Sequence, residues 1–157
     1  IEAQTLSPKS RLRLQRCLEF VQGQLNAIEW EKSPCQFGHG DAHPMNLIGN
    51  TWIDFEDAYW GPHSYDLATV VWSTLRCEQT QPLWRAALEA YNTIFPIQAH
   101  TLGQISTFVA VRHIWWLGMH AMHFGQFPIH AQEPTFLDQG IELLQVICTD
   151  ACGMQAP

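Results

Sequence analysis

The longest apolar segment of the chain, Leu102 to Phe124, most constrains how the chain can fold. Its apolar residues lie nearly all round a helical wheel, which is typical of a helix that is buried on every side. We therefore expect a central helix over residues 100–124, covered by other helices. Apolar residues also recur at helical spacing in shorter segments that are separated by Pro or Gly. These segments predict helices over residues 8–28, 65–75, 82–95 and 133–152.

The segment between the first two predicted helices has a different character. Leu47-Ile48 and residues 51–55 are β-prone, and Gly49-Asn50 between them is a favourable two-residue hairpin turn. We expect a short antiparallel hairpin here, in a chain that is otherwise mainly α. The expected register pairs Ile48 with Thr51, Leu47 with Trp52, and Asn46 with Ile53.

The chain has 157 residues, of which 46% are hydrophobic, so it is long enough to bury one core. We expect a single domain over residues 1–157. Trp60-Gly61-Pro62 predicts a break that separates the hairpin from the helices that follow it. The domain accordingly divides into a leading helix at 1–34, a loop and hairpin at 35–58, and a helical subdomain at 59–157.

Charge and cysteine content exclude several classes of protein. The net charge of −7 argues against a nucleic-acid partner, because phosphate backbones attract basic surfaces. No apolar run approaches the roughly 20 residues that cross a bilayer, so we expect no membrane partner. The cysteines include no C-x-x-C pair, which favours a reducing, cytoplasmic compartment. Cys148 and Cys152 lie four residues apart, and we expect core packing for them, with a metal or redox role as the alternative.

The segment His39–Asn46, followed by Asp54, contains the groups that phosphoryl transfer requires. That reaction needs a carboxylate that orients the attacking hydroxyl and accepts its proton, and oxygen ligands that hold Mg²⁺ against nucleotide phosphates. Asp41 supplies such a carboxylate. In the expected register Asn46 and Asp54 lie side by side, because opposed strands are about 5 Å apart. Both side chains can therefore reach one metal ion.

These residues belong to three ordered motifs: H-G-D-x-H-P-x-N at 39–46, I-D-F-E-D-A at 53–58 and G-P-x-x-Y-D-L-A at 61–68. Their order and spacing resemble the aminoglycoside phosphotransferase family, which includes choline kinase-like and homoserine kinase-like enzymes. That family shares the protein-kinase fold. The resemblance implies that this chain is the C-terminal catalytic lobe of the fold, and that its substrate is a small molecule with a hydroxyl group.

The resemblance also implies roles for single residues. Asp41 matches the catalytic Asp that receives the substrate hydroxyl, and His39 matches the histidine that positions the same loop. Asn46 and Asp54 match the two Mg²⁺ ligands, which also hold the metal-bound nucleotide. Asp66 matches an Asp that braces the catalytic loop through its backbone.

Other residues are candidates for support or for the substrate side of the site. His43 matches a position that shapes the loop, and Glu56 and Asp57 match an acidic pair whose second member assists at the metal or the substrate. Trp115-Trp116 could form an aromatic wall for a cationic ligand. Neighbouring helical residues point about 100° apart, so core packing is the alternative for at least one of these tryptophans.

Histidines gather late in the chain. A shared helix face could allow several of them to bind a metal, but polar groups that line the cleft or cap the core are the interpretation that we favour. His120 is the member that we place on the substrate side. The full group is His113, His120, His123 and His130. A nearby acidic set forms either a substrate rim or a solvated helix face, and it comprises Glu133, Asp138 and Glu142.

The residues before His39 contain neither a Gly-rich strand-loop-strand nor a lysine strand of the kind that clamps nucleotide phosphates. We therefore expect the N-terminal nucleotide-binding lobe to be absent. ATP is then a co-substrate only if that lobe is supplied. The surface that the lobe would cover is a candidate homodimer interface.

Three functions follow from these patterns. The first is an ATP- and Mg²⁺-dependent phosphotransferase lobe that transfers the γ-phosphate to an aminoglycoside-like, choline-like or homoserine-like hydroxyl. The second is a non-catalytic, truncated lobe that binds a ligand or dimerises. The third is a metal-dependent hydrolase that uses the His and Asp residues. The sequence leaves the substrate, and the activity of the isolated chain, open.

Overall fold

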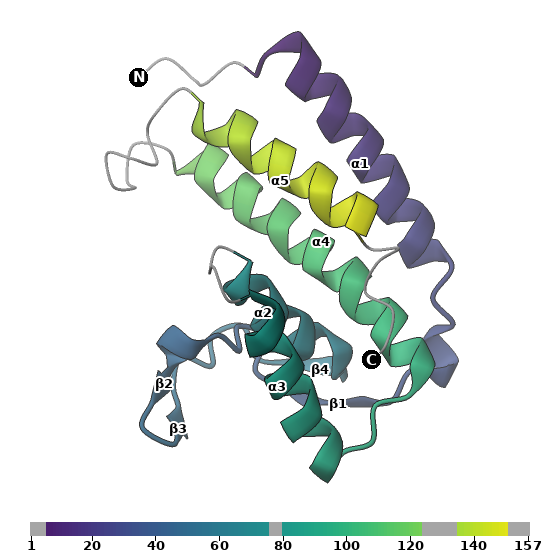
Figure 1. Cartoon of the computed structure of the whole chain (residues 1–157), viewed down its shortest axis with the longest axis vertical. Helices are drawn as coiled ribbons and strands as arrows, with labels where there is room; N and C mark the ends of the chain where they lie inside the picture. The colour runs from purple at the N-terminus through teal and green to yellow at the C-terminus, as the bar shows by residue number, and fades with distance from the viewer. Residues whose placement is uncertain (1–5, 76–79, 124–134, 151–157) are drawn as a thin grey trace.

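The computed structural model describes residues 6–75, 80–123 and 135–150, and it is mainly helical with two small antiparallel sheets (Figure 1). The helices are α1 (Pro8–Asn26), α2 (Ser64–Thr74), α3 (Thr80–Ile94), α4 (Ala99–Met122) and α5 (Phe136–Asp150). The strands are β1 (Cys35–Gly38), β2 (Leu47–Ile48), β3 (Thr51–Trp52) and β4 (Tyr59–Pro62). The short 3-10 helices are η1 (Trp30–Lys32) and η2 (Pro44–Asn46).

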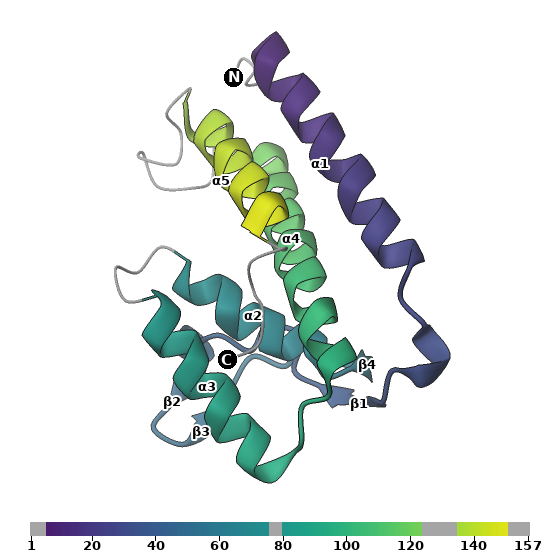
Figure 2. The same cartoon turned by 45° about the vertical axis from the view of Figure 1, so that its right-hand side comes forward.

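The prediction of a central buried helix is confirmed. α4 packs against α1, α2 and α5. Figures 1 and 2 show α5 alongside the C-terminal half of α4 and α2 near its N-terminal half. Val109 and Ala110 of α4 are buried together with Leu144 of α5 and Val71 of α2. The core therefore lies around α4, and apolar residues on several of its sides each meet a different neighbour.

The helix boundaries lie close to the predicted ones. Ser7 caps α1 by accepting a hydrogen bond from the Ser10 backbone N–H at 3.1 Å, and Pro8 occupies the first turn. α1 ends at Asn26 and α4 ends at Met122, each two residues before the predicted end. The outer parts of the last predicted helix, residues 133–134 and 151–152, lie outside the described residues.

The predicted hairpin register is confirmed, although the hairpin is shorter than expected. Leu47 pairs with Trp52 and Ile48 pairs with Thr51. The Ile53 backbone N–H continues the register by donating to the Asn46 carbonyl at 3.0 Å. The prediction of a strand up to residue 55 was wrong, because Asp54 has a φ of 64° and leaves the extended conformation.

The interpretation of Trp60-Gly61-Pro62 as a break was wrong. These residues belong to β4, which pairs antiparallel with β1. The two glycines in this sheet make room for the Tyr59 ring, since a Cβ at Gly38 would lie 2.3 Å from Tyr59 Cε1 and one at Gly61 would lie 2.9 Å from that ring. The sheet joins segments on both sides of residue 58, where the sequence placed a subdivision of the domain.

Cys148 packs in the core, as expected. It lies on α5 and is buried, as is Cys17 of α1. Burial, and then the neighbouring Cys17 thiol, raise the pKa of Cys148 to about 12, so its thiol stays protonated at neutral pH. Cys152 lies outside the described residues.

None of the helices in the described part of the chain has the length and apolar character that a membrane span needs.

Candidate active site

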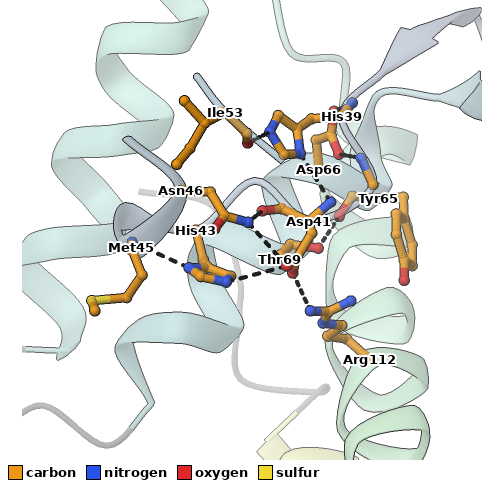
Figure 3. A network of polar contacts seen from close by, with 11 residues as sticks. His39, Asp41, His43, Met45, Asn46, Ile53, Tyr65, Asp66, Thr69 and Arg112 are labelled. Carbon is orange, nitrogen blue, oxygen red and sulfur yellow. Dashed lines mark hydrogen bonds and ion pairs between the residues drawn. The ribbon is translucent and has the colours of Figure 1, made fainter. Parts of the chain in front are cut away.

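The loop after β1 is fixed at its backbone by a carboxylate from α2. Asp66, in the first turn of α2, accepts the His39 backbone N–H at Oδ2 (2.8 Å) and the Gly40 backbone N–H at Oδ1 (2.9 Å). Figure 3 shows this carboxylate beside the His39 end of the loop. These two contacts are the ones that the predicted bracing role of Asp66 requires.

His39 connects the loop to the end of the hairpin. Its Nδ1 accepts the Asp41 backbone N–H at 3.3 Å, so Nε2 carries the proton and donates to the Ile53 carbonyl at 2.8 Å. The ring is buried and lies 4.4 Å, centroid to centroid, from Phe55. Because both ring nitrogens are engaged, this arrangement suits a positioning role better than proton transfer.

The Asp41 carboxylate lies at the centre of the polar network (Figure 3). Its Oδ1 accepts a hydrogen bond from Arg112 Nη2 of α4. Its Oδ2 lies 3.0 Å from Asn46 Nδ2 and 3.2 Å from His43 Nε2. Asn46 Nδ2 also donates to the Asp41 carbonyl at 3.0 Å. The carboxylate is therefore held in one orientation by groups from both the loop and α4.

His43 presents a donor to this carboxylate. Its Nδ1 accepts the Met45 backbone N–H at 3.1 Å, at the start of η2. The ring proton therefore lies on Nε2, which faces Asp41 Oδ2. In this arrangement His43 orients the carboxylate.

Asn46 and Asp54 lie at the same end of the hairpin, because Asp54 directly follows the residue that is hydrogen-bonded to Asn46. Asn46 is buried and turns its amide nitrogen toward Asp41, so its amide oxygen lies on the opposite side of the group. Asp54 is exposed. Within the described residues, no hydrogen bond or ion pair occupies its carboxylate.

A cavity of about 370 Å³ opens beside the loop. Asp57 and Trp115, both predicted for the substrate side, line it together with Gly40. Its other walls are mainly aromatic, and the full lining is Trp30, Gly40, Asp57, Tyr59, Pro62, Tyr65, Phe108, Arg112 and Trp115. The lining therefore combines mainly apolar residues with one acidic and one basic residue, and it includes Gly40, which directly precedes Asp41.

Three other candidates for the substrate side do not line this cavity. Glu56 is exposed on the turn after the hairpin. Trp116 and His120 pack against Phe136 of α5, with ring centroids 5.3 Å and 5.1 Å from it. The structure therefore separates the two neighbouring tryptophans, one at the cavity and one between helices.

Tyr59 lines the cavity, and its hydroxyl is already hydrogen-bonded within the protein. It donates to the Pro62 carbonyl at 2.9 Å. Burial, and next the nearby Asp66 carboxylate, raise the pKa of Tyr59 well above its usual range, so the hydroxyl stays protonated. Tyr59 therefore contributes shape and a fixed dipole.

Two of the late histidines, His113 and His120, are buried within the helical core. His113 Nδ1 accepts from Trp72 Nε1 at 3.1 Å, and its Nε2 donates to the Gly140 carbonyl at 2.8 Å. Among the described residues no group of three or more His, Cys, Asp or Glu side chains is arranged to hold a metal. His130 and Glu133 lie outside those residues.

Asp138 and Glu142 of α5 do not line the cavity. Glu142 accepts a hydrogen bond from Arg13 of α1 at 2.9 Å, so it joins two helices. Asp138 lies in the first turn of α5.

Arg112 is the charged site residue that the sequence did not assign, beside the aromatic cavity walls Trp30, Tyr59, Tyr65 and Phe108. The sequence did contain a sign of its importance, because Arg112 is the single Lys, Arg, Asp or Glu in α4. A charge in a helix predicted to be buried needs a partner, since an unpaired buried charge is very costly. The partner is Asp41, 71 residues earlier, and no local pattern predicts contact over that separation.

Residues 2–101 match the model of the phosphotransferase enzyme family (APH). The chain belongs to this family. The match contains every predicted site residue from His39 to Asp66, and it ends at the start of α4, before Arg112. The resemblance found in the motifs is therefore confirmed at the level of the family.

An uncharacterized protein from Deinococcus radiodurans is 33% identical to the chain over 117 residues. The alignment covers 68% of this chain and 34% of that protein. The chain thus spans about a third of the length of this relative. No solved structure matches this chain significantly.

Proposed function

We propose that this chain is the catalytic part of an ATP- and Mg²⁺-dependent phosphotransferase that phosphorylates a hydroxyl group of a small molecule. The observation that most supports this function is the Asp41 carboxylate, which Arg112, Asn46 and His43 hold beside an aromatic cavity. The chain also belongs to the phosphotransferase enzyme family. In this proposal the chain corresponds to the C-terminal lobe of a protein kinase-like fold and acts in the cytoplasm.

The proposed chemistry follows from what Asp41 can do. The acceptor hydroxyl binds to the carboxylate, and its oxygen forms a bond to the γ-phosphorus of ATP. The bond between the γ-phosphorus and the β–γ bridging oxygen breaks, and ADP leaves with that electron pair. The hydroxyl proton passes to Asp41. Such transfers depend mostly on positioning and on charge stabilisation, which a carboxylate fixed by several hydrogen bonds can supply.

The hairpin offers a donor set that fits Mg²⁺. The amide oxygen of Asn46, turned away from Asp41, and the exposed carboxylate of Asp54 are hard oxygen ligands of the kind that Mg²⁺ prefers. When bound, the metal would neutralise negative charge on the nucleotide phosphates during transfer. The proposal assigns the clamping of those phosphates to an N-terminal lobe outside these 157 residues.

The cavity is the proposed acceptor pocket. Its walls suit a small molecule with an apolar or cationic body, because aromatic rings and the Asp57 carboxylate both attract cations. The acceptors that we consider remain choline-like, homoserine-like and aminoglycoside-like molecules. Trp115 lies at the cavity and is the candidate aromatic contact, whereas Trp116 packs between helices.

The decisive experiment replaces Asp41 in the complete protein that contains this chain. ADP release from MgATP is measured with choline, homoserine and an aminoglycoside as acceptors. Asp41→Asn should lower kcat by about 10²- to 10⁴-fold, the range that a positioned proton acceptor contributes. Glu89→Gln, an exposed position on α3, is the matched control and should keep wild-type turnover. Wild-type turnover by Asp41→Asn would contradict the proposed function.

A second candidate function is a non-catalytic module that binds a ligand or forms a homodimer. It is favoured by large apolar side chains that are exposed near the loop: Phe37, Met45, Ile48 and Trp60. Sedimentation of the isolated chain and calorimetry with MgATP test the module. A dimer of the isolated chain supports the module, whereas micromolar MgATP binding by the monomer contradicts it and supports the phosphotransferase.

A further inference from the structure

Arg112 is a buried cation with a defined position. It is 4% exposed, and its Nη2 donates to Asp41 Oδ1. Its guanidinium carbon Cζ lies 4.2 Å from the ring centroid of Trp115 and 5.4 Å from that of Trp72. A planar guanidinium stacks on indole rings and forms directional hydrogen bonds, which an ammonium group cannot do equally well. The stacking and the burial together leave the side chain little freedom.

The hydrogen bonds of Asp41 are distributed unequally between its two oxygens. A carboxylate oxygen has two lone pairs. Oδ2 receives both Asn46 Nδ2 and His43 Nε2. Among the described residues Oδ1 receives Arg112 only. The remaining acceptor capacity of the carboxylate is therefore on Oδ1, the oxygen that faces Arg112.

The same residue connects this oxygen to the cavity. Arg112 and Gly40 both line the cavity, and Gly40 directly precedes Asp41. Asp41 does not itself line the cavity, but its Oδ1 is bonded to Arg112, which does. A hydroxyl that approaches along Arg112 would therefore meet the Oδ1 side of Asp41. Approach to Oδ2 would have to displace His43 or Asn46, at the cost of an existing hydrogen bond.

We propose that Arg112 is a positioning residue that holds Asp41 with Oδ1 toward the cavity, and so selects the oxygen that takes up the proton of the acceptor hydroxyl. This inference rests on the function proposed above. It adds to that function a residue beyond the matched family segment, which ends at residue 101. In this role Arg112 acts through Asp41 and needs no contact with the reacting atoms.

The inference predicts a specific split in the kinetics. Loss of the Arg112 contact lets Asp41 rotate but leaves most of the cavity walls in place. Arg112→Met in the complete protein should therefore lower kcat by about 10²-fold, the usual cost of a small misplacement, with a much smaller change in the KM for the acceptor. Arg112→Lys keeps a buried charge paired with Asp41 and should restore only part of the lost kcat. Arg85→Met is the matched control, because Arg85 also lies over a tryptophan but is exposed on α3.

Chemical rescue separates positioning from a purely structural role. Arg112→Ala leaves space next to Asp41, so added methylguanidinium should raise its kcat, whereas tetramethylammonium at equal ionic strength should not. The assay is ADP release from MgATP with whichever of choline, homoserine and an aminoglycoside gives turnover, or with water as the acceptor if none does. Circular dichroism and urea unfolding establish which variants fold.

The outcomes are distinguishable from those of the proposed function. If Asp41→Asn abolishes turnover while a folded Arg112→Met keeps its kcat, the inference is wrong and the phosphotransferase proposal stands. If Arg112→Met fails to fold, Arg112→Lys decides, and a wild-type kcat in that variant overturns the inference. Loss of kcat in the folded variants, with rescue by methylguanidinium, supports it.

Discussion

At the scale of single residues, the candidate site depends on a glycine as much as on its charged groups. Gly40 has a φ of +83°, and a Cβ at this position would lie 2.0 Å from the Asp57 carbonyl oxygen. The backbone can approach Asp57 this closely only without a side chain. The same residue donates its N–H to Asp66. Gly40 thus allows the loop to pack against residue 57 and α2 at once.

This packing predicts that Gly40→Ala destabilises the protein more than Gly49→Ala does. Both glycines have a positive φ, which costs an alanine about 1–2 kcal/mol. Only Gly40 has backbone atoms in the way, since nothing lies within 4 Å of a Cβ at Gly49. Urea unfolding of the two variants measures the difference. Equal losses of unfolding free energy would show that the loop moves aside at no cost.

At the scale of elements, a neutral histidine lies at the contact between α2 and α3. His63, the residue before α2, is 4% exposed, and neither of its ring nitrogens has a hydrogen-bond partner among the described residues. Its ring stacks on Tyr91 of α3 at 5.9 Å. Burial, and to a smaller extent the charge of His100, lower the pKa of His63, and the nearby Pro34 carbonyl opposes this shift only partly.

The lowered pKa predicts a loss of stability in acid. A histidine whose pKa is lower in the folded state contributes its full stability above the unfolded pKa of about 6.5, and loses it as the pH falls below that value. The free energy of unfolding in urea should therefore decline below pH 6.5. His63→Phe should reduce this decline, whereas His100→Gln removes only a minor cause and should keep most of it. A His63→Phe variant with the wild-type pH dependence would contradict the assignment.

At the scale of the whole molecule, one buried amide joins three separate parts of the chain. Gln104 of α4 donates from Nε2 to Ser33 Oγ at 2.6 Å, just before β1. Its Oε1 accepts from Ser64 Oγ at 2.9 Å, at the start of α2. These bonds hold the beginning of β1 and the beginning of α2 against the central helix, and so help to position the loop between them.

We predict that replacing the Gln104 amide lowers the free energy of unfolding of the whole protein. Gln104→Leu leaves the buried Ser64 hydroxyl without its acceptor, which costs about 1–3 kcal/mol for an unsatisfied group. It also removes the bond to Ser33 Oγ, which keeps its own bond to the Glu29 carbonyl at 3.4 Å. Gln139→Leu, at an exposed position of α5, is the control and should change the free energy of unfolding little. The urea midpoints of both variants test this. A Gln104→Leu variant as stable as the control would mean that the two serines find other partners.

The parts of the fold that the sequence predicted are those encoded by nearby residues. The start of α1 follows from Ser7 and Pro8, and the hairpin register follows from the Gly49-Asn50 turn. In both cases the interacting groups are only a few residues apart. The β1–β4 sheet was missed because Gly61 and Pro62 suggest a break locally, and the Tyr59 ring that requires the glycine becomes visible only in the folded chain.

The sequence by itself determined the helical class, the family and the order of the candidate site residues, because apolar periodicity and motif spacing are local properties. Tertiary structure alone decided which distant groups meet. Arg112 contacts Asp41 only in the folded chain. Asp57 and Trp115 line the same cavity, whereas Trp116 packs between helices. The physical reason is that a buried charge or ring takes its partner from whichever element packs against it, and the packing of α4 against its neighbours fixes that choice.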